Sequence, residues 1–260
     1  MTTETNPVIF AGAGPGDPDL ITVKGQTALA GADLIIYAGS LVPEALLKWK
    51  RADAQAVNSA AMDLGDIINM IQQAHGQGQK IVRLHTGDPS LYGAIFEQMR
   101  ELDRCYIPYE VIPGVTAAFA AAAAMGMEYT LPEVTQTLIL TRISGRTPVP
   151  DQEDLDLLAA HHSSMAIYLS IVHVKRVQEI LSRHYGEDGV CAIAYKIGHP
   201  QERIIYTTLA HLSHTVETQN IKSQALILVG DAVAVARDKG EVIASKLYDA
   251  GFTHGFREKK

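Results

Sequence analysis

The sequence predicts an α/β protein built from two domains, and three observations support this. Apolar runs of strand length alternate with helical patterns along most of the chain, which is typical of a parallel sheet covered by helices. The alternation breaks in residues 126–137 and then starts again. In the second half, the run at 203–206 follows the run at 190–195 after a short turn, which favours an antiparallel pair. We therefore expect an N-terminal domain of residues 1–136 with a mostly parallel sheet, and a C-terminal domain of residues 137–260 with a mixed sheet.

In the first half, short apolar runs mark the strands and longer periodic segments mark the helices. Strands are expected at residues 8–11, 34–37, 81–84 and 109–112. Helices are expected near residues 20–30, 67–76 and 94–102, and an alanine-rich helix follows residues 113–116 (PGVT). Alanine is the best helix former, and its small side chain allows either tight packing or the close approach of a ligand.

The second half shows the same alternation. Strands are expected at residues 138–141, 165–169, 190–195, 203–206 and 225–229. Helices are expected near residues 154–161, 174–185 and 209–218.

Composition and charge are typical of a soluble globular protein. The chain has 260 residues, of which 47% are hydrophobic and 20% charged. Its longest nonpolar run, residues 117–127, is too short to span a bilayer, and residues 1–7 (MTTETNP) lack the features of a secretory signal. We therefore expect a cytoplasmic protein without a membrane segment. A net charge of −7 and the lack of a basic stripe argue against a nucleic-acid partner.

Cysteine and histidine usage predicts neither a disulfide framework nor a protein-bound metal. The two cysteines, Cys105 and Cys191, lie far apart in the sequence, and Cys191 sits in a buried-strand pattern that is typical of a core residue. The ten histidines are scattered without metal-ligand spacing.

Two glycine-rich segments follow predicted strands, where open α/β sheets place their ligand sites. Residues 87–93 (GDPSLYG) combine flexible glycines, an acceptor in Asp88 and a fixed φ at Pro89. An ordinary turn that opens a helix explains this segment equally well. Residues 12–17 (GAGPGD) follow the first strand, so the two segments together favour one ligand crevice.

The segment at 12–17 does not fit a dinucleotide. The pattern G-x-G-x-x-G that starts at Gly12 requires glycine where Asp17 stands. Pro15 also removes a backbone N–H from the turn, and Asp17 places negative charge beside the expected phosphates. A nicotinamide or flavin dinucleotide is therefore disfavoured.

A third polar segment carries two arginines. Residues 141–150 (TRISGRTPVP) leave a predicted strand, and arginine offers a planar fork of donors that matches carboxylates. A loop over an anionic ligand and a solvated surface loop both remain open.

Three segments and the spacing between them carry a resemblance over nearly the whole chain. Residues 12–22 (GAGPGDPDLIT), 87–89 (GDP) and 113–117 (PGVTA) resemble the tetrapyrrole (corrin and porphyrin) methyltransferases. Further segments resemble the branch of that family that methylates precorrin-4 at C11, namely residues 37–42 (YAGSLV), 87–93 (GDPSLYG), 131–137 (LPEVTQT), 145–150 (GRTPVP) and 252–257 (FTHGFR).

The resemblance implies a homodimer whose two α/β domains bind S-adenosylmethionine between them and which serves cobalamin (vitamin B12) biosynthesis. The sulfonium of this cofactor is cationic and carries no phosphate, so Asp17 is no objection to it. Residues that match cofactor contacts of the family in the first domain are Pro15, Thr86, Gly87, Asp88, Leu91, Thr116 and Ala117. In the second domain the matches rest on short strand ends and imply Leu169, Ala194, Ile197 and Ala225, which core packing explains equally well.

The implied reaction moves a methyl group from sulfur to a ring carbon, so orientation of the two reactants is the main task of the enzyme. Relatives that methylate uroporphyrinogen are expected to carry an aspartate where this chain has Ala38, so the proton acceptor stays unassigned, with Asp17 as a candidate. Arg142, Arg146 and Lys24 are candidates for binding the carboxylates of the macrocycle.

Other functions remain open at this stage. A related methyltransferase could act at another corrin carbon, or on a protein side chain in diphthamide synthesis. From other classes, a dinucleotide oxidoreductase predicts tight NAD(P) binding, and a non-catalytic module predicts cofactor affinity without turnover.

Overall fold

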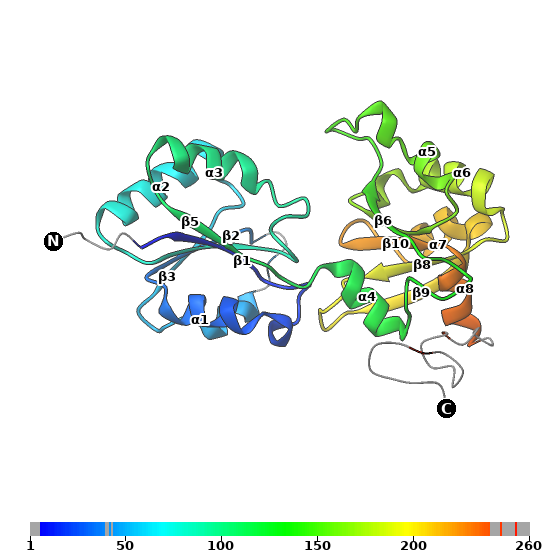
Figure 1. Cartoon of the computed structure of the whole chain (residues 1–260), viewed down its shortest axis with the longest axis horizontal. Coiled ribbons are helices and arrows are strands. Elements are labelled where there is room, and N and C mark those ends of the chain that lie inside the picture. Colours follow the sequence, from blue (N-terminus) through cyan, green and yellow to red (C-terminus); the bar gives the residue numbers. More distant parts are fainter. Residues whose placement is uncertain (1–5, 40–41, 43, 240–244, 246–252, 254–260) are drawn as a thin grey trace. The chain divides into compact units, whose positions relative to one another are not determined.

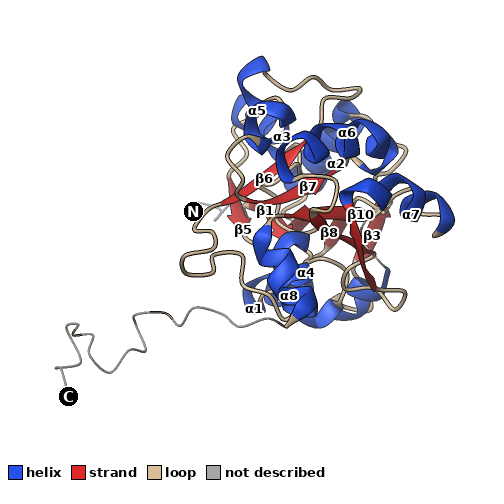
Figure 2. Cartoon of the chain, turned by 90° about the vertical axis from the view of Figure 1, so that its right-hand side faces the viewer, coloured by secondary structure: helices blue, strands red, loops and turns tan. Residues whose placement is uncertain are grey.

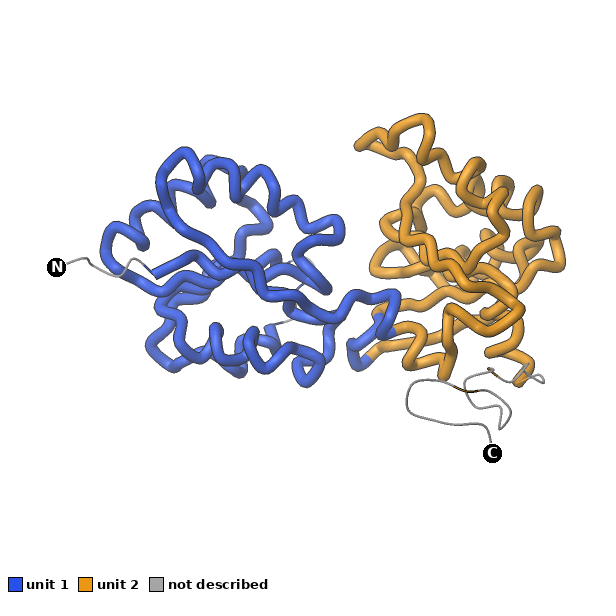
Figure 3. The backbone as a smooth tube through the Cα atoms, in the orientation of Figure 1, with its two compact units in different colours: residues 1–120, 197–200 blue, residues 121–196, 201–260 orange. Residues whose placement is uncertain are grey.

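The chain folds into two compact units, which Figure 3 shows in two colours. The computed structural model describes residues 6–39, 42, 44–239, 245 and 253. The first unit comprises residues 1–120 and 197–200, and the second comprises residues 121–196 and 201–260. Helix α4 (Ala117–Met125) runs from the first unit into the second. Residues 121–136, which the sequence assigns to the first domain, group with the second unit.

The first unit contains a five-stranded sheet whose neighbouring strands are all parallel (Figure 1). Its strands, in spatial order, are β3 (Gln55–Asn58), β2 (Leu34–Tyr37), β4 (Ile81–His85), β1 (Val8–Gly12) and β5 (Tyr109–Ile112). All five strands therefore end at the same edge, and β1 ends between β4 and β5.

Helices cover both faces of this sheet. Figure 1 shows α2 (Leu64–Gly76) and α3 (Ile95–Arg104) on one face and α1 (Val23–Gly31) on the other. Phe10 and Ile36 are fully buried in the core that includes α2 and α3, whereas Ile35 and Leu84 are fully buried in the core that includes α1. Strand side chains alternate between the two faces, so the central strands β1 and β2, which are covered on both sides, are built almost wholly of apolar residues.

The second unit contains a mixed five-stranded sheet. Its strands, in spatial order, are β6 (Leu138–Arg142), β7 (Ser164–Tyr168), β10 (Ala225–Val229), β8 (Val190–Tyr195) and β9 (Arg203–Thr208). Strands β6 and β7 are parallel, and the other three pairs are antiparallel. Figure 2 shows α5 (Leu155–Ala159), α6 (Val174–Tyr185) and α7 (Leu212–Thr218) on one side of this sheet and α8 (Asp231–Asp238) on the other.

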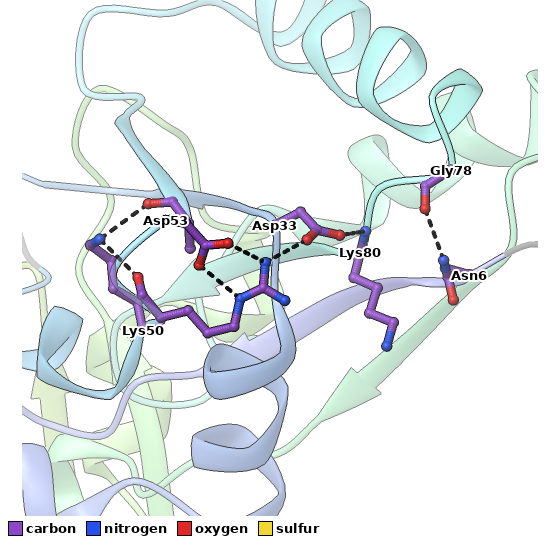
Figure 4. A network of polar contacts seen from close by, with 8 residues as sticks. Asn6, Asp33, Lys50, Asp53, Gly78 and Lys80 are labelled. Atoms are coloured by element: carbon purple, nitrogen blue, oxygen red, sulfur yellow. Dashed lines mark hydrogen bonds and ion pairs between the residues drawn. The ribbon is translucent and has the colours of Figure 1, made fainter.

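A network of charged side chains joins the starts of the strands in the first unit (Figure 4). Asp33, which precedes β2, accepts hydrogen bonds from the Lys80 backbone N–H at 2.8 Å and from Arg51 Nη2 at 2.8 Å. Arg51 also pairs with Asp53 at 3.1 Å. The bond to the Lys80 amide and the Arg51 guanidinium together hold the pKa of Asp33 below its usual range. A shallow cavity of about 440 Å³ lies here, but its charged groups pair with one another, so we assign it a structural role.

All the strands predicted from the sequence are present, and the parallel first sheet and mixed second sheet are confirmed. Among the described strands and α-helices, strand β3 and helix α8 escaped prediction, and so did the 3₁₀ helix Glu44–Trp49. No helix in the described part of the chain is long and apolar enough to cross a membrane.

Candidate functional site

The candidate site lies at the carboxyl edge of the first sheet, where the loops after β1, β4 and β5 meet. The chain reverses its direction along the sheet at this point, because β1 lies between β4 and β5 and the next strand in the sequence, β2, lies beyond β4. Ligands of open α/β sheets bind at such switch points. The two glycine-rich segments and the segment 113–116 all belong to these loops, as the sequence predicted.

Four glycines bring the backbones of β1 and of these loops into direct contact. Gly14 and Gly87 form an isolated antiparallel bridge, in which the Gly87 N–H donates to the Gly14 carbonyl at 2.7 Å and the Gly14 N–H donates to the Gly87 carbonyl at 3.2 Å. A Cβ on Gly114 would lie 2.1 Å from the Gly87 carbonyl oxygen and 2.8 Å from the Gly12 Cα. Side chains are therefore excluded here, and the edge presents backbone to a ligand.

Asp88 is the side chain that ties the loop after β4 to the loop after β5. Its Oδ2 accepts a hydrogen bond from the Gly114 N–H at 2.9 Å, and its Oδ1 accepts one from the Ser90 N–H at 2.8 Å. Both carboxylate oxygens are thus used in shaping the site. The structure assigns Asp88 a clear positioning role, and direct contact with a ligand stays a prediction.

A segment from the second half of the sequence also packs on this edge. Residues 197–200 belong to the first unit, although the rest of the surrounding sequence belongs to the second. A Cβ on Gly16 would lie 2.6 Å from Cδ2 of His199, and a Cβ on Gly198 would lie 2.8 Å from the Asp17 backbone nitrogen. Ile197, which the resemblance implies as a cofactor contact, is buried in this segment.

The remaining first-unit residues predicted to contact a cofactor lie in the same loops. Pro15 and Leu91 belong to the loops after β1 and β4, and Thr86 directly follows β4. Thr116 is buried, and its Cα would lie 3.7 Å from a Cβ on Gly87. Ala117 is the first residue of α4. The first unit thus contains all eight of these residues, in its loops or at the start of α4: Pro15, Thr86, Gly87, Asp88, Leu91, Thr116, Ala117 and Ile197.

The second-unit candidates occupy two kinds of position. Ala194 is buried in β8, and Ala225 is the first residue of the neighbouring strand β10, paired with Tyr195. Leu169 directly follows β7, is 62% exposed, and has a φ of 53°. An exposed leucine in a left-handed conformation is unfavourable on its own, which is a feature that concentrates at functional sites.

The candidates for substrate and proton binding differ in how free their charges are. The Arg142 guanidinium donates to the carbonyls of Thr147 and Pro148, each at 2.9 Å, and so braces its own loop. Arg146 and Lys24 are exposed. Asp17 uses Oδ1 to accept from the Asp19 N–H at 2.9 Å, which caps a short helical turn. Their proposed roles stay predictions.

Two buried polar residues of this unit were not singled out from the sequence. Arg83 and His85 lie on β4 immediately before the loop that carries Asp88, and each is 5% exposed. Burial and the nearby Arg83 charge lower the pKa of His85 to about 3, so its ring is neutral. The sequence did contain a signal for Arg83, because an arginine inside the apolar run IVRL is expected to be buried, and charged side chains are seldom buried without a partner.

The described residues contain no group of three or more His, Cys, Asp or Glu side chains placed to hold a metal. Residues 40 and 41 of the segment 37–42, and all of the segment 252–257 except Thr253, lie outside the described residues.

Comparisons with known proteins find similar sequences and structures over most of the chain. The cobalt-precorrin-4 C(11)-methyltransferase of Methanocaldococcus jannaschii is 48% identical over 96% of this chain and 96% of its own length. The precorrin-4 C(11)-methyltransferase of Pseudomonas aeruginosa is also 48% identical, over 96% of this chain and 98% of its own length. The X-ray structure of a cobalt precorrin-4 methyltransferase superposes with a TM-score of 0.85 at 43% identity, covering 87% of this chain and 95% of that chain.

A more distant structure shares the fold. The uroporphyrin-III C-methyltransferase of Thermus thermophilus, complexed with S-adenosylhomocysteine, has a TM-score of 0.70 at 23% identity over 88% of this chain and 94% of that chain. Residues 7–213 match the tetrapyrrole (corrin/porphyrin) methylases as a family. With that match and relatives at 48% identity over nearly their full length, the chain belongs to the tetrapyrrole methylases.

Proposed function

We propose that this protein transfers a methyl group from S-adenosylmethionine to C11 of precorrin-4, or of its cobalt complex, in cobalamin biosynthesis. One observation carries the proposal. Two relatives named for C11 methylation, one for the cobalt form and one for the metal-free form, are each 48% identical to this chain over 96% of its length. The cobalt, where present, would belong to the substrate.

The residues at the carboxyl edge of the first sheet fit this cofactor. S-adenosylmethionine supplies an activated methyl group on a positively charged sulfur and carries no phosphate. The edge offers backbone carbonyls and close-packed glycines, including a Gly114 at which a Cβ would fall 2.1 Å from the Gly87 carbonyl oxygen. Pro15 removes an N–H donor and Asp17 adds a negative charge, so the loop after β1 is unsuited to a pyrophosphate.

In this proposal the protein acts mainly by holding its two substrates in the geometry of attack. Orientation of this kind contributes as much as about 7–11 kcal/mol to a reaction between two bound molecules. Asp88 would keep the loops after β4 and β5 together, and Leu91 and Ile197 would supply apolar contacts. Arg146 and Lys24 would pair with substrate carboxylates, while Arg142 would hold the loop that presents Arg146.

The proposal includes a homodimer in the cytoplasm, as the family resemblance implies. Sedimentation velocity of the purified protein tests the dimer.

Calorimetric titration tests the cofactor assignment. We expect S-adenosylhomocysteine to bind the wild-type protein with micromolar affinity and NADH to show no binding. Preference for NADH would overturn the proposal and favour an oxidoreductase. Binding of S-adenosylhomocysteine without methyl transfer to either form of precorrin-4 would instead indicate another substrate or a non-catalytic module.

A further inference from the structure

The loop that carries Asp88 contains several unfavourable backbone conformations. Tyr92 and Ala94 are left-handed, with φ values of 56° and 49°, although neither is glycine. Between them, a Cβ on Gly93 would lie only 2.1 Å from the Pro89 carbonyl oxygen. Non-glycine residues keep such conformations only where their surroundings hold them. Something outside the loop must therefore fix its end at Ala94, where α3 begins.

A chain of hydrogen bonds that begins in the core reaches that point, with two buried bonds at Arg83 and a partly buried bond at Ala94. Arg83 Nη1 donates to the Ile36 carbonyl at 3.2 Å, and Arg83 Nε donates to Gln98 Oε1 at 3.1 Å. Gln98 Nε2 in turn donates to the Ala94 carbonyl at 3.0 Å. Arg83 and Gln98 are each 5% exposed. The chain therefore connects the neighbouring strand β2, through β4, to the left-handed residue that closes the loop.

The chemistry of Arg83 points to a specific task. Burial lowers the pKa of Arg83 to about 10, so the guanidinium is still charged at neutral pH. Among the described residues, no carboxylate lies within ion-pair distance of Arg83, and its bonds to Gln98 and to the Ile36 carbonyl both go to neutral oxygens. A charge-assisted bond polarises Gln98, which strengthens the bond from Gln98 to Ala94.

Ala94 has no capping side chain of its own, although it occupies the N-cap position of α3. Serine, threonine, asparagine or aspartate usually fixes this position. The Gln98 side chain does not replace that cap, because it donates to the Ala94 carbonyl and does not accept from an N–H of the first turn, but it is a side-chain contact that holds Ala94 in place.

We propose that Arg83 and Gln98 are positioning residues for the cofactor loop, residues 87–94. They hold Ala94 in its left-handed conformation and so set where Asp88 meets the Gly114 N–H. This inference rests on the proposed function only in treating that loop as the binder of S-adenosylmethionine.

Gln98→Glu separates positioning from general stability. A carboxylate at this position still accepts from Arg83 Nε and adds an opposite charge, but it cannot donate to the Ala94 carbonyl. We expect the thermal unfolding midpoint to stay at or above the wild-type value. We expect the Kd for S-adenosylhomocysteine to rise about tenfold, the size expected for the loss of one hydrogen bond.

Gln178→Glu in the second unit is a matched control. Gln178 also bridges two backbone groups, donating to the Ala210 carbonyl at 3.2 Å and accepting from the Ser213 N–H at 2.8 Å. Its Kd for S-adenosylhomocysteine should equal that of the wild type. Wild-type affinity in Gln98→Glu, or equal weakening in both variants, would overturn the inference.

Amide hydrogen exchange distinguishes failure of this inference from failure of the proposed function. In Gln98→Glu without ligand, the amides of Ser90 and Gly114 should exchange faster, while those of β8 should not change. That result would support the positioning role even if the wild-type protein did not bind S-adenosylhomocysteine. Unchanged exchange at both amides would overturn it.

The wild-type protein alone provides a second test if the variant does not fold. Binding of S-adenosylhomocysteine should slow exchange at Ser90 and also in the first turn of α3, residues 95–98, because the Gln98 contact links them. Slowing at Ser90 without any change in that turn would overturn the inference.

Discussion

Replacement of Asp88 tests how the site is built. Asp88→Ala removes both acceptors, the one bonded to the half-buried Gly114 N–H and the one bonded to the exposed Ser90 N–H. A hydrogen bond to a charged group contributes about 1.5–3 kcal/mol, and an exposed capping bond contributes about 0.5 kcal/mol because water replaces it. We therefore expect Asp88→Ala to lower the free energy of unfolding by about 2 kcal/mol. Asp88→Asn keeps one acceptor oxygen and should lose about half as much.

The assay combines urea unfolding with calorimetric titration of S-adenosylhomocysteine. Cofactor affinity should fall at least about tenfold in Asp88→Ala, and less in Asp88→Asn, because the loops after β4 and β5 separate. Asp154→Ala is the control, since Asp154 Oδ1 also accepts a backbone N–H, that of Asp156 at 2.9 Å, but in the second unit. It should lose about 1 kcal/mol of stability and no cofactor affinity. Wild-type stability and affinity in Asp88→Ala would refute the reasoning.

Three further predictions concern backbone packing and buried titratable groups. Gly114→Ala should lower the free energy of unfolding by about 1–3 kcal/mol and weaken cofactor binding, because its Cβ would clash with backbone. Gly76 is the control: no atom lies within 4 Å of a Cβ there, so Gly76→Ala should raise the free energy of unfolding by about 0.5–1 kcal/mol in the same urea assay. Burial and the Arg83 charge lower the pKa of His85 to about 3, so the unfolded chain takes up a proton near pH 6.5 that the folded protein does not. The free energy of unfolding should therefore fall by about 1.4 kcal/mol per pH unit from pH 6 to pH 4. In unfolding curves measured across that range, His85→Phe should remove this part of the slope. Burial raises the pKa of the Cys191 thiol to about 12. A thiol reagent at pH 8 should therefore label Cys105 alone in the folded protein and both cysteines in urea. Two labels on the folded protein would contradict the buried position of Cys191.

The sheets and most helices were predictable because apolar periodicity is a local signal. Helix 174–185 was predicted with the bounds that the structure has, and its apolar residues Val177, Ile180 and Leu181 are all buried. Strand β3 was missed because it is an edge strand of four residues, QAVN, with two exposed ends and no apolar run. Helix α8 was missed although its sequence is compatible with a helix, because no N-cap side chain marks its start at Gly230.

The site was predictable in part, for the same reason. Loops after β1, β4 and β5 follow directly from strand order, so Gly87 and Asp88 could be placed at the carboxyl edge of the sheet. The packing of His199 against Gly16 could not be predicted, because it joins segments that are far apart in the sequence and depends on how the chain returns to the first unit. The link from Arg83 through Gln98 to Ala94 depends on side-chain geometry between a strand and a helix, which periodicity does not contain.

The most direct test of the central claim is the position of the transferred methyl group. The purified enzyme would be incubated without oxygen with precorrin-4, or its cobalt complex, and S-adenosylmethionine labelled with carbon-13 in the methyl group, and the product examined by NMR. We predict one labelled methyl group per macrocycle, bonded to C11, with release of one S-adenosylhomocysteine. Label on another ring carbon, or no consumption of the cofactor with either substrate, would contradict the account.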